Sequence, residues 1–406
     1  MWKKIKGSVR DFELLLILPP IFLIAIVFST PLIDINEGFD TDGLVYGAMA
    51  SKGDFPLAWL SRTSPLCYRV LTPFLVSLLP FEILTNFKVW VFFSNWLSIV
   101  FLYLLFQKMN LSKTFSMIGV LFYIGIFWTI KFSFYSPAYI DFQTLLLLII
   151  NFYLIVNKKF WILPASIGIS ILQKEIFLFL IPFAILYSWT YSKEMSLKRL
   201  TQFFLLLIVP IFCFFIPRIF IDPINSYSPL KTLLFNFKMI FFPHRFYPRF
   251  FLSIFSGLGV LPLILILHWK GVGKILNNQK YWILWLLIGV LLLFGGVDKS
   301  RLYLPLAPLI AYLAVCSIQR ENPSWNIWFA LWIGGTLILH FYLGNLLTPM
   351  GNSNDYINRL VPMHSKVSLY PLIGNRLALS FLWLFFSVIL QKKIYLVNNL
   401  KNLRQG

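Results

Sequence analysis

The residues that could perform chemistry in this chain are mostly carboxylates, and a third of them gather near its start. Of 15 acidic residues, five lie between positions 34 and 54: Asp34, Glu37, Asp40, Asp42 and Asp54. Asp42 precedes residues 43–50, which we expect to be helical, so its carboxylate either caps that helix or serves as a general base. A plain solvated loop is the alternative. We take Asp42 as the first candidate for the general base and Asp40 as the second.

A second group combines an aromatic residue with an arginine. Arg69 follows Tyr68 directly, and Thr72 and Pro73 come shortly afterwards. An arginine at a membrane surface binds a lipid phosphate through two parallel hydrogen bonds. The alternative is an arginine that extends to the lipid headgroups without a specific ligand. Tyr68 and Arg69 are therefore candidates for binding a lipid phosphate.

Charged residues adjoin apolar runs at three further places, namely Asp141, Gln173-Lys174-Glu175 and Asp298-Lys299-Ser300-Arg301. Burying an unpaired carboxylate costs several kcal/mol, so we expect Asp141 to face a cavity or a partner. Lys174 and Glu175 either belong to a functional site or neutralise each other. Arg301, with Asp298 beside it, is a further candidate for the phosphate.

Several common kinds of site lack support in the sequence. The chain has no Walker loop, no GxSxG and no GxGxxG after a strand, so the motifs of an ATPase, an ordinary serine hydrolase and a dinucleotide enzyme are all missing. The four histidines are scattered, so no histidine-based metal site is expected: His244, His268, His340 and His364. The three cysteines have neither disulfide nor zinc spacing: Cys67, Cys213 and Cys316.

The composition indicates that these residues are positioned by membrane-spanning helices. The chain is 59% hydrophobic and only 12% charged, with a mean hydropathy of +0.78. A soluble protein carries about a quarter charged residues. The net charge of +20 is explained by basic cytoplasmic loops that face anionic lipid. A nucleic-acid partner is not expected, because the sequence has no basic stripe that alternates with exposed aromatic residues.

Apolar runs predict an all-α polytopic membrane protein with about 12 spans (11–13), as a single transmembrane domain over 1–406 without a separate soluble domain. The first run has no small-residue cleavage site after it, so we interpret it as a retained span rather than a signal peptide. The predicted spans are 14–31, 86–107, 114–131, 139–156, 160–173, 176–191, 202–220, 250–267, 281–296, 302–318, 325–343 and 374–391.

The distribution of charged residues sets the orientation of the predicted spans in the membrane. Both termini are basic and an even number of spans places both in the cytoplasm. Eleven of the 15 acidic residues then fall outside. They lie in a first outer loop at 32–85, in the loops 221–249 and 344–373, in short turns and, for Asp141, at the outer end of the span 139–156. The segment 66–84 contains Pro73 and Pro80, and we predict that it lies on the outer surface as an interfacial helix rather than crossing as a further span.

In their order, these features resemble the GT-C superfamily of integral membrane glycosyltransferases, particularly its bacterial branch of mannosyltransferase-like and glycopolymer-forming enzymes. The resemblance covers residues 14 to 318. It rests on Asp42-Gly43 with Tyr46 and Ala50, Tyr68-Arg69 with Pro73, Asp141, Lys174-Glu175, and Asp298 with Arg301. Relatives carry Arg-Glu where this chain has Lys174-Glu175, and the larger ones end in a soluble domain.

The resemblance implies inverting transfer of a sugar from a polyprenyl-phosphate donor to a lipid, glycan or protein acceptor on the outer face of a bacterial inner membrane. It assigns Asp42 as the base or as an acid close to a metal ion, and leaves a divalent cation, Mg²⁺ or Mn²⁺, as an open cofactor. Arg69, Lys174 and Arg301 would stabilise the departing lipid phosphate. Besides donor and acceptor, membrane lipids are the expected partners.

Three other functions remain open on the sequence. A transporter or flippase for lipid-linked saccharides would also keep charges at membrane depth, but would place them in both halves of the bilayer. An O-antigen polymerase or ligase would use a late outer loop, for which 344–373 with His364 is the candidate. A non-catalytic membrane scaffold is the third.

Overall fold

The computed structural model describes residues 17–33, 38–39, 41–51, 61–191, 196–225, 258–279, 281–292, 303–321, 326–345 and 381–394, with a few positions in 228–238 and at 378–379. Within these residues every regular element is a helix, which confirms the expected all-α class. The contacts divide the chain into two compact units. The first is Met1–Asn110, Thr129–Pro229 and Gly351–Ser353, and the second is Leu111–Trp128, Leu230–Met350 and Asn354–Gly406.

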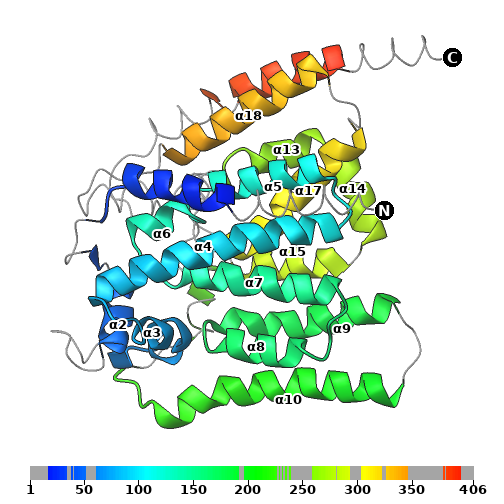
Figure 1. Ribbon diagram of the computed structural model, residues 1–406. Helices are drawn as coiled ribbons and strands as arrows, with labels where there is room; N and C mark the ends of the chain where they lie inside the picture. The colour runs from blue at the N-terminus through cyan, green and yellow to red at the C-terminus, as the bar shows by residue number, and fades with distance from the viewer. Residues whose placement is uncertain are drawn as a thin grey trace, which may run out of the picture. The chain divides into compact units, whose positions relative to one another are not determined.

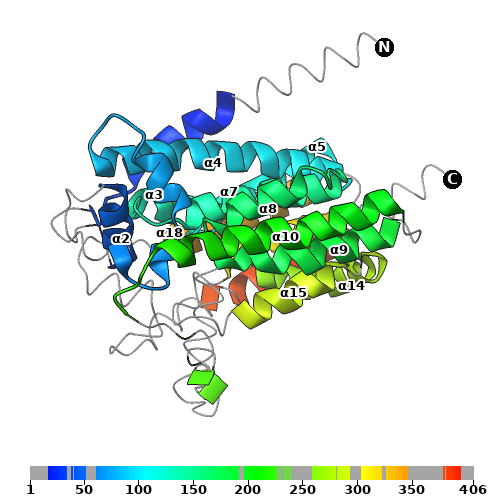
Figure 2. The same ribbon diagram turned by 90° about the horizontal axis from the view of Figure 1, so that it is seen from below.

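The first unit contains the residues of the candidate site. Its elements are the helix Ile17–Ser29, α2 (Thr41–Ala50), η3 (Leu66–Tyr68), α3 (Leu71–Val76), α4 (Ile83–Lys108), α6 (Lys131–Tyr135), α7 (Asp141–Val156), α8 (Leu163–Ile171), η4 (Glu175–Phe179), α9 (Leu180–Tyr191) and α10 (Leu197–Phe220). The helix α4 packs along α7, and α8 packs along α10 (Figure 1 and Figure 2). The short elements α2, η3 and α3 contact each other beside the start of α4.

The second unit is built around α17. It comprises α5 (Lys113–Gly125), α13 (Leu261–Leu267), α14 (Trp269–Asn278), α15 (Tyr281–Leu292), η5 (Leu304–Leu306), α17 (Ala307–Glu321), α18 (Ile327–Asn345) and helical residues 381–394. The helix α17 packs against α5, α13 and α14. Buried His340 of α18 donates from Nε2 to the Phe122 carbonyl at 2.7 Å, and its Nδ1 accepts from the Val260 N–H at 3.3 Å.

Two of the described helices, α4 and α10, are both long and apolar enough to cross a membrane. Other predicted spans correspond to shorter apolar helices, among them α7 and α18. The predicted span 114–131 is interrupted: α5 ends at Gly125 and α6 begins only at Lys131. In the segment 66–84 the structure has η3 and α3, and a helix of six residues extends only about 9 Å, too short to cross a bilayer.

Large apolar side chains lie exposed in stripes along several helices. On α10 they recur every three or four residues, at Phe204, Ile208, Phe212, Phe215 and Ile219. Such spacing places them on one helix face. A stripe of the same kind follows the helix Ile17–Ser29, at Ile17, Ile21, Ile24 and Phe28.

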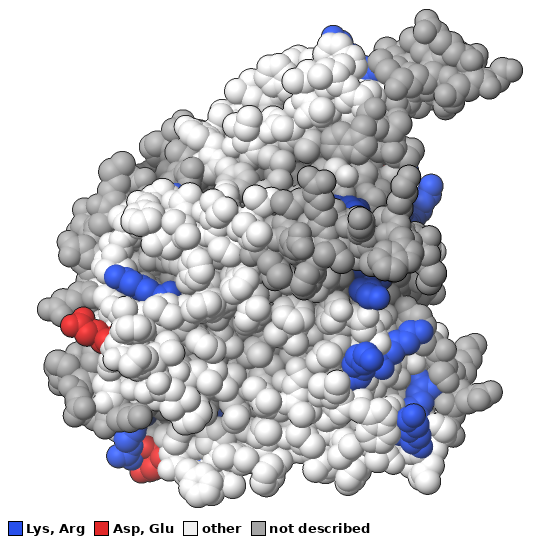
Figure 3. All heavy atoms as spheres, viewed as in Figure 1, with Lys and Arg blue, Asp and Glu red and all other residues white. Residues whose placement is uncertain are grey.

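The charged residues of the first unit lie toward the ends of its helices. Lys108 ends α4 and Lys158 follows α7, whereas Glu82 precedes α4 and Asp222 follows α10. Over these helices Figure 3 shows a broad uncharged surface between charges at either end. This distribution is typical of helices that traverse an apolar layer.

Candidate functional site

The candidate site is centred on an ion pair between Arg69 and Glu175. Arg69 directly follows η3, and Glu175 begins η4. The Arg69 Nε donates to Glu175 Oε2 at 3.3 Å, and Arg69 Nη1 donates to the Tyr46 hydroxyl oxygen at 3.2 Å. Tyr46 lies in the middle of α2 and is 1% exposed. The segment from α2 to η3 and the η4 turn therefore meet at this arginine.

Arg218 brings a second cation to the same carboxylate. Its Nη2 lies 3.3 Å from Glu175 Oε1, so the two carboxylate oxygens face different guanidinium groups. The Arg218 guanidinium lies over the rings of Phe214, at 3.7 Å from the centroid, and Tyr68, at 4.4 Å. Such cation–π contacts hold the side chain in one orientation. Arg218, stacked on Phe214 and Tyr68, thus contacts the Glu175 oxygen that Arg69 Nε does not contact.

The role of Arg218 was not anticipated from the sequence. It lies within the predicted span 202–220, where it is the only charged residue. That isolation near the C-terminal end of an apolar run is the signal that could have identified it, because charges within membrane-spanning runs are rare and face partners or cavities.

Lys174 and Asp141 form a second ion pair next to the first. The Lys174 Nζ lies 2.7 Å from Asp141 Oδ1, and the Asp141 side chain is 8% exposed. Lys174 is therefore the partner that burial of Asp141 requires. The pair joins the start of α7 to the segment that precedes η4.

Gln173 holds the backbone around both pairs. Its Oε1 accepts from the Thr72 N–H at 3.1 Å and from the Thr72 hydroxyl at 2.8 Å, and its Nε2 donates to the Ile140 carbonyl at 2.9 Å. The Gln173 side chain is fully buried. Because these bonds tie the residues next to Arg69, Asp141 and Lys174 together, Gln173 positions the cations and carboxylates relative to one another. Sequence reasoning had noted Gln173 only as a neighbour of Lys174.

Asp42 lies in the first turn of α2, one helical turn before Tyr46. Burial raises the pKa of Tyr46 above its usual value, and the negative charge of Asp42 raises it further, so Tyr46 keeps its proton at neutral pH. Burial alone would lower the pKa of Arg69, but Glu175, Tyr46 and Asp42 together raise it. Asp42 is therefore within electrostatic reach of the arginine.

Glu175 is ionised at neutral pH despite its partial burial. Burial works to raise its pKa, but Arg69, its own backbone N–H, Arg218 and Lys174 hold that pKa below its usual value. Arg69, Arg218 and Glu175 together carry one excess positive charge, while Lys174 and Asp141 compensate each other. A guanidinium has five N–H donors, so both arginines keep donors for a further anion.

Six of the predicted site residues are thus assembled in the first unit: Asp42, Tyr68, Arg69, Asp141, Lys174 and Glu175. Asp40, Asp298 and Arg301 lie outside the described residues, as does the loop around His364. Across the part of the chain that is described, no three His, Cys, Asp or Glu side chains are gathered as ligands of a metal ion.

The arrangement suits binding of an anion beside a carboxylate. Two arginines with an excess positive charge match a phosphate, and the carboxylate of Asp42 lies within electrostatic reach of one of them.

Protein-family models and curated proteins were both compared with the chain, and no match was found.

Proposed function

We propose that this chain is a polytopic membrane glycosyltransferase of the GT-C type. It moves a sugar from a polyprenyl-phosphate donor to a lipid, glycan or protein acceptor on the non-cytoplasmic face. The observation that carries the proposal is the pair of arginines, Arg69 and Arg218, that share Glu175 within electrostatic reach of Asp42.

The membrane placement rests on the helices. In this proposal α4 and α10 cross the bilayer together with the shorter apolar helices, in about a dozen crossings with both termini in the cytoplasm. The exposed stripe on α10 and that on Ile17–Ser29 support it, because soluble proteins rarely leave such continuous apolar surfaces uncovered. The arginine cluster then lies at the outer ends of α7 and α10.

The lipid phosphate of the donor is held by Arg69 and Arg218. Glu175 orients both guanidinium groups and leaves N–H donors for the phosphate oxygens. These donors stabilise the negative charge that grows on the phosphate as the bond to the sugar breaks. Phe214 and Tyr68 restrict Arg218, so little orientational freedom is lost on binding.

Asp42 is the general base. The acceptor hydroxyl attacks the anomeric carbon from the face opposite the phosphate, and its proton passes to the Asp42 carboxylate. The bond between the anomeric carbon and the phosphate oxygen breaks, and the electron pair leaves with the polyprenyl phosphate. One attack of this kind inverts the configuration at the anomeric carbon. Tyr46 keeps its proton, because its pKa is raised, and therefore does not act as the base.

Loss of Arg218 tests the phosphate site. Binding of a labelled polyprenyl phosphate to the purified full chain should weaken about tenfold or more in Arg218→Gln, since a charge-assisted hydrogen bond is removed. Arg62→Gln is the matched control, because its ion pair with Asp222 is exposed, at 50% and 91% of the side chains, and surface pairs contribute little. Equal binding by both variants and the unaltered chain would contradict the proposed phosphate site.

A further inference from the structure

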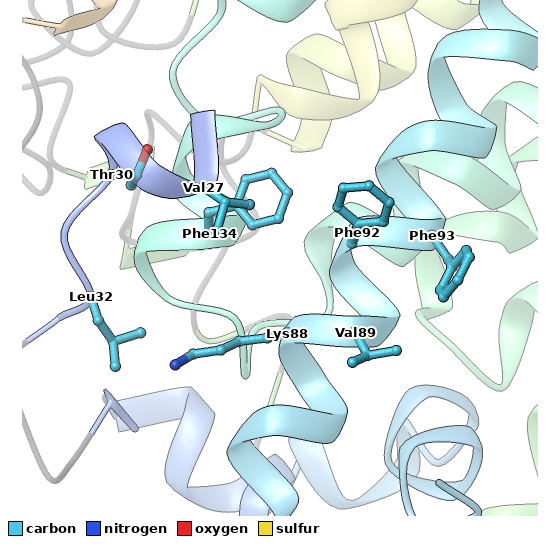
Figure 4. Close-up of a pocket in the computed structure, with 8 residues that line it drawn as sticks. All are labelled: Val27, Thr30, Leu32, Lys88, Val89, Phe92, Phe93 and Phe134. Atoms are coloured by element: carbon cyan, nitrogen blue, oxygen red, sulfur yellow. The ribbon is translucent and has the colours of Figure 1, made fainter. Parts of the chain in front are cut away.

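A pocket of about 350 Å³ lies in the first unit and contains none of the residues of the arginine cluster. Its walls include Val27, Thr30, Leu32, Lys88, Phe92 and Phe134. Figure 4 shows these side chains coming from the end of the helix Ile17–Ser29, the segment after it, α4 and α6. The volume and the largely apolar lining are those of a small-molecule site.

Adjacent residues of α4 belong to the pocket and to the core beside the candidate active site. Phe87 is fully buried and belongs to the core cluster that also contains Tyr46. Lys88, the next residue, is exposed and lines the pocket instead. Phe92 follows Lys88 by one helical turn and therefore lies on the same face. Phe87 thus packs in the core with Tyr46, whereas Lys88 and Phe92 line the pocket.

Two polar groups lie among the apolar walls of the pocket. The Thr30 hydroxyl oxygen is buried and, among the described residues, has no hydrogen-bond partner. The Lys88 ammonium makes no ion pair within the described part of the chain. The Thr30 hydroxyl oxygen has almost no accessible surface, and Figure 4 shows that it does not point toward the Lys88 ammonium. The exposed Lys88 ammonium is therefore the group of this pocket that can meet an anion, and a cation beside apolar walls favours an anionic lipid headgroup.

We propose that this pocket binds one anionic glycerophospholipid of the bilayer, with its phosphate on Lys88 and an acyl chain against Phe92 and Phe134. Phe28, 87% exposed at the end of the helix Ile17–Ser29, and Phe93, 47% exposed on α4, continue the apolar surface outside the pocket. A lone positive charge prefers a lipid with net negative charge over a zwitterionic one. The inference rests on the membrane placement proposed above and not on sugar transfer.

The test counts bound lipid on the full chain. The chain is equilibrated in detergent micelles with dioleoyl phosphatidylglycerol or dioleoyl phosphatidylcholine, and bound lipid is measured by native mass spectrometry. We expect one retained phosphatidylglycerol and an affinity about tenfold lower in Lys88→Gln, whereas the isosteric Thr30→Val should bind as the unaltered chain does. Lys238→Gln, which removes an exposed lysine outside the pocket, should bind as the unaltered chain does.

Several outcomes would overturn the inference. Equal retention of phosphatidylcholine, or unchanged binding in Lys88→Gln, would exclude recognition of an anionic headgroup. If inorganic phosphate competed as effectively as phosphatidylglycerol, a contribution of the acyl chain would be excluded. Stronger competition by polyprenyl phosphate would assign the pocket to the sugar donor instead. If Lys88→Gln does not fold, Lys88→Arg must fold and bind within about threefold of the unaltered chain, since the charge is kept. Sugar transfer is measured separately, so its failure leaves this result intact.

Discussion

Arg69 and Glu175 are 106 residues apart in the sequence, yet Arg69 Nε and Glu175 Oε2 lie 3.3 Å from one another. The other oxygen of the same carboxylate faces Arg218 at 3.3 Å. Two cations therefore depend on one acid for their orientation. This dependence makes the acid, rather than either arginine, the most sensitive single position for the stability of the cluster.

Glu175→Gln should lower the free energy of unfolding by about 3 kcal/mol, because it leaves two partly buried guanidinium groups without their counter-charge. The stabilising effect of the Glu175 carboxylate should also depend on pH. The pKa of Glu175 is lower in the folded chain, so its contribution is complete above the ordinary glutamate pKa of about 4.3 and is lost as the pH falls through the lower folded value.

Thermal unfolding of the detergent-solubilised chain, recorded over pH 3 to 7, measures this effect. The difference in melting temperature between the unaltered chain and Glu175→Gln should shrink as the medium becomes more acidic. A difference that stays constant across the range would show that folding does not lower the pKa of Glu175, and would contradict its pairing with Arg69 and Arg218.

Asp141 and Lys174 should behave as a coupled pair. Asp141→Asn leaves the Lys174 ammonium, 22% exposed, without the carboxylate at 2.7 Å, and should cost about 2 kcal/mol. The double variant Asp141→Asn with Lys174→Gln should be less destabilised than the sum of the single variants, because the second change removes the unpaired charge. Chemical unfolding of all four proteins gives the coupling energy, and strict additivity would contradict a direct interaction.

Gly125 and His340 should show a steric dependence in the second unit. A methyl group at Gly125 would collide with the ring of His340, whereas one at Gly334 would meet nothing within 4 Å. Gly125→Ala should therefore destabilise by about 1–3 kcal/mol, and Gly334→Ala should be neutral or slightly stabilising because alanine favours helices. Melting temperatures of the two variants that do not differ would contradict this packing.

The crossing of α4 can be tested at its two ends. Glu82 precedes the helix and Asn110 follows it, and both are exposed. Single cysteines at these positions, in a chain whose three native cysteines are replaced, should react with an impermeant maleimide from opposite sides of sealed vesicles. Labelling of both positions from the same side would exclude a membrane-spanning α4.

Much of the cluster followed from physical rules applied to the sequence. Asp141 needed a partner because an unpaired buried carboxylate is unfavourable, and Lys174 supplies it. Tyr68, Arg69 and Glu175 were singled out because charges beside apolar runs are uncommon. Which arginine would contact which acid depends on the packing of α10 against α8 and η4, and no local pattern encodes that packing.

Two features were missed because they depend on contacts with distant parts of the chain. Arg218 lay within an apolar run, where hydropathy outweighed a single charge. The helix in 114–131 ends at Gly125, where the ring of His340 occupies the space that a side chain would fill. Both depend on residues more than 40 positions away in the sequence, so periodicity within one segment carries no information about them.

Transfer of sugar by Asp42→Asn tests the central claim most directly. The purified full chain is given polyprenyl-phosphate sugars, and release of polyprenyl phosphate is measured beside donor binding and thermal stability, with the exposed Asp222→Asn as control. We predict that Asp42→Asn binds the donor within about twofold and loses about 10²- to 10⁴-fold in turnover, the usual contribution of a general base. Undiminished turnover in folded Asp42→Asn would contradict the assignment of the base and, with it, the proposed chemistry of the outer face.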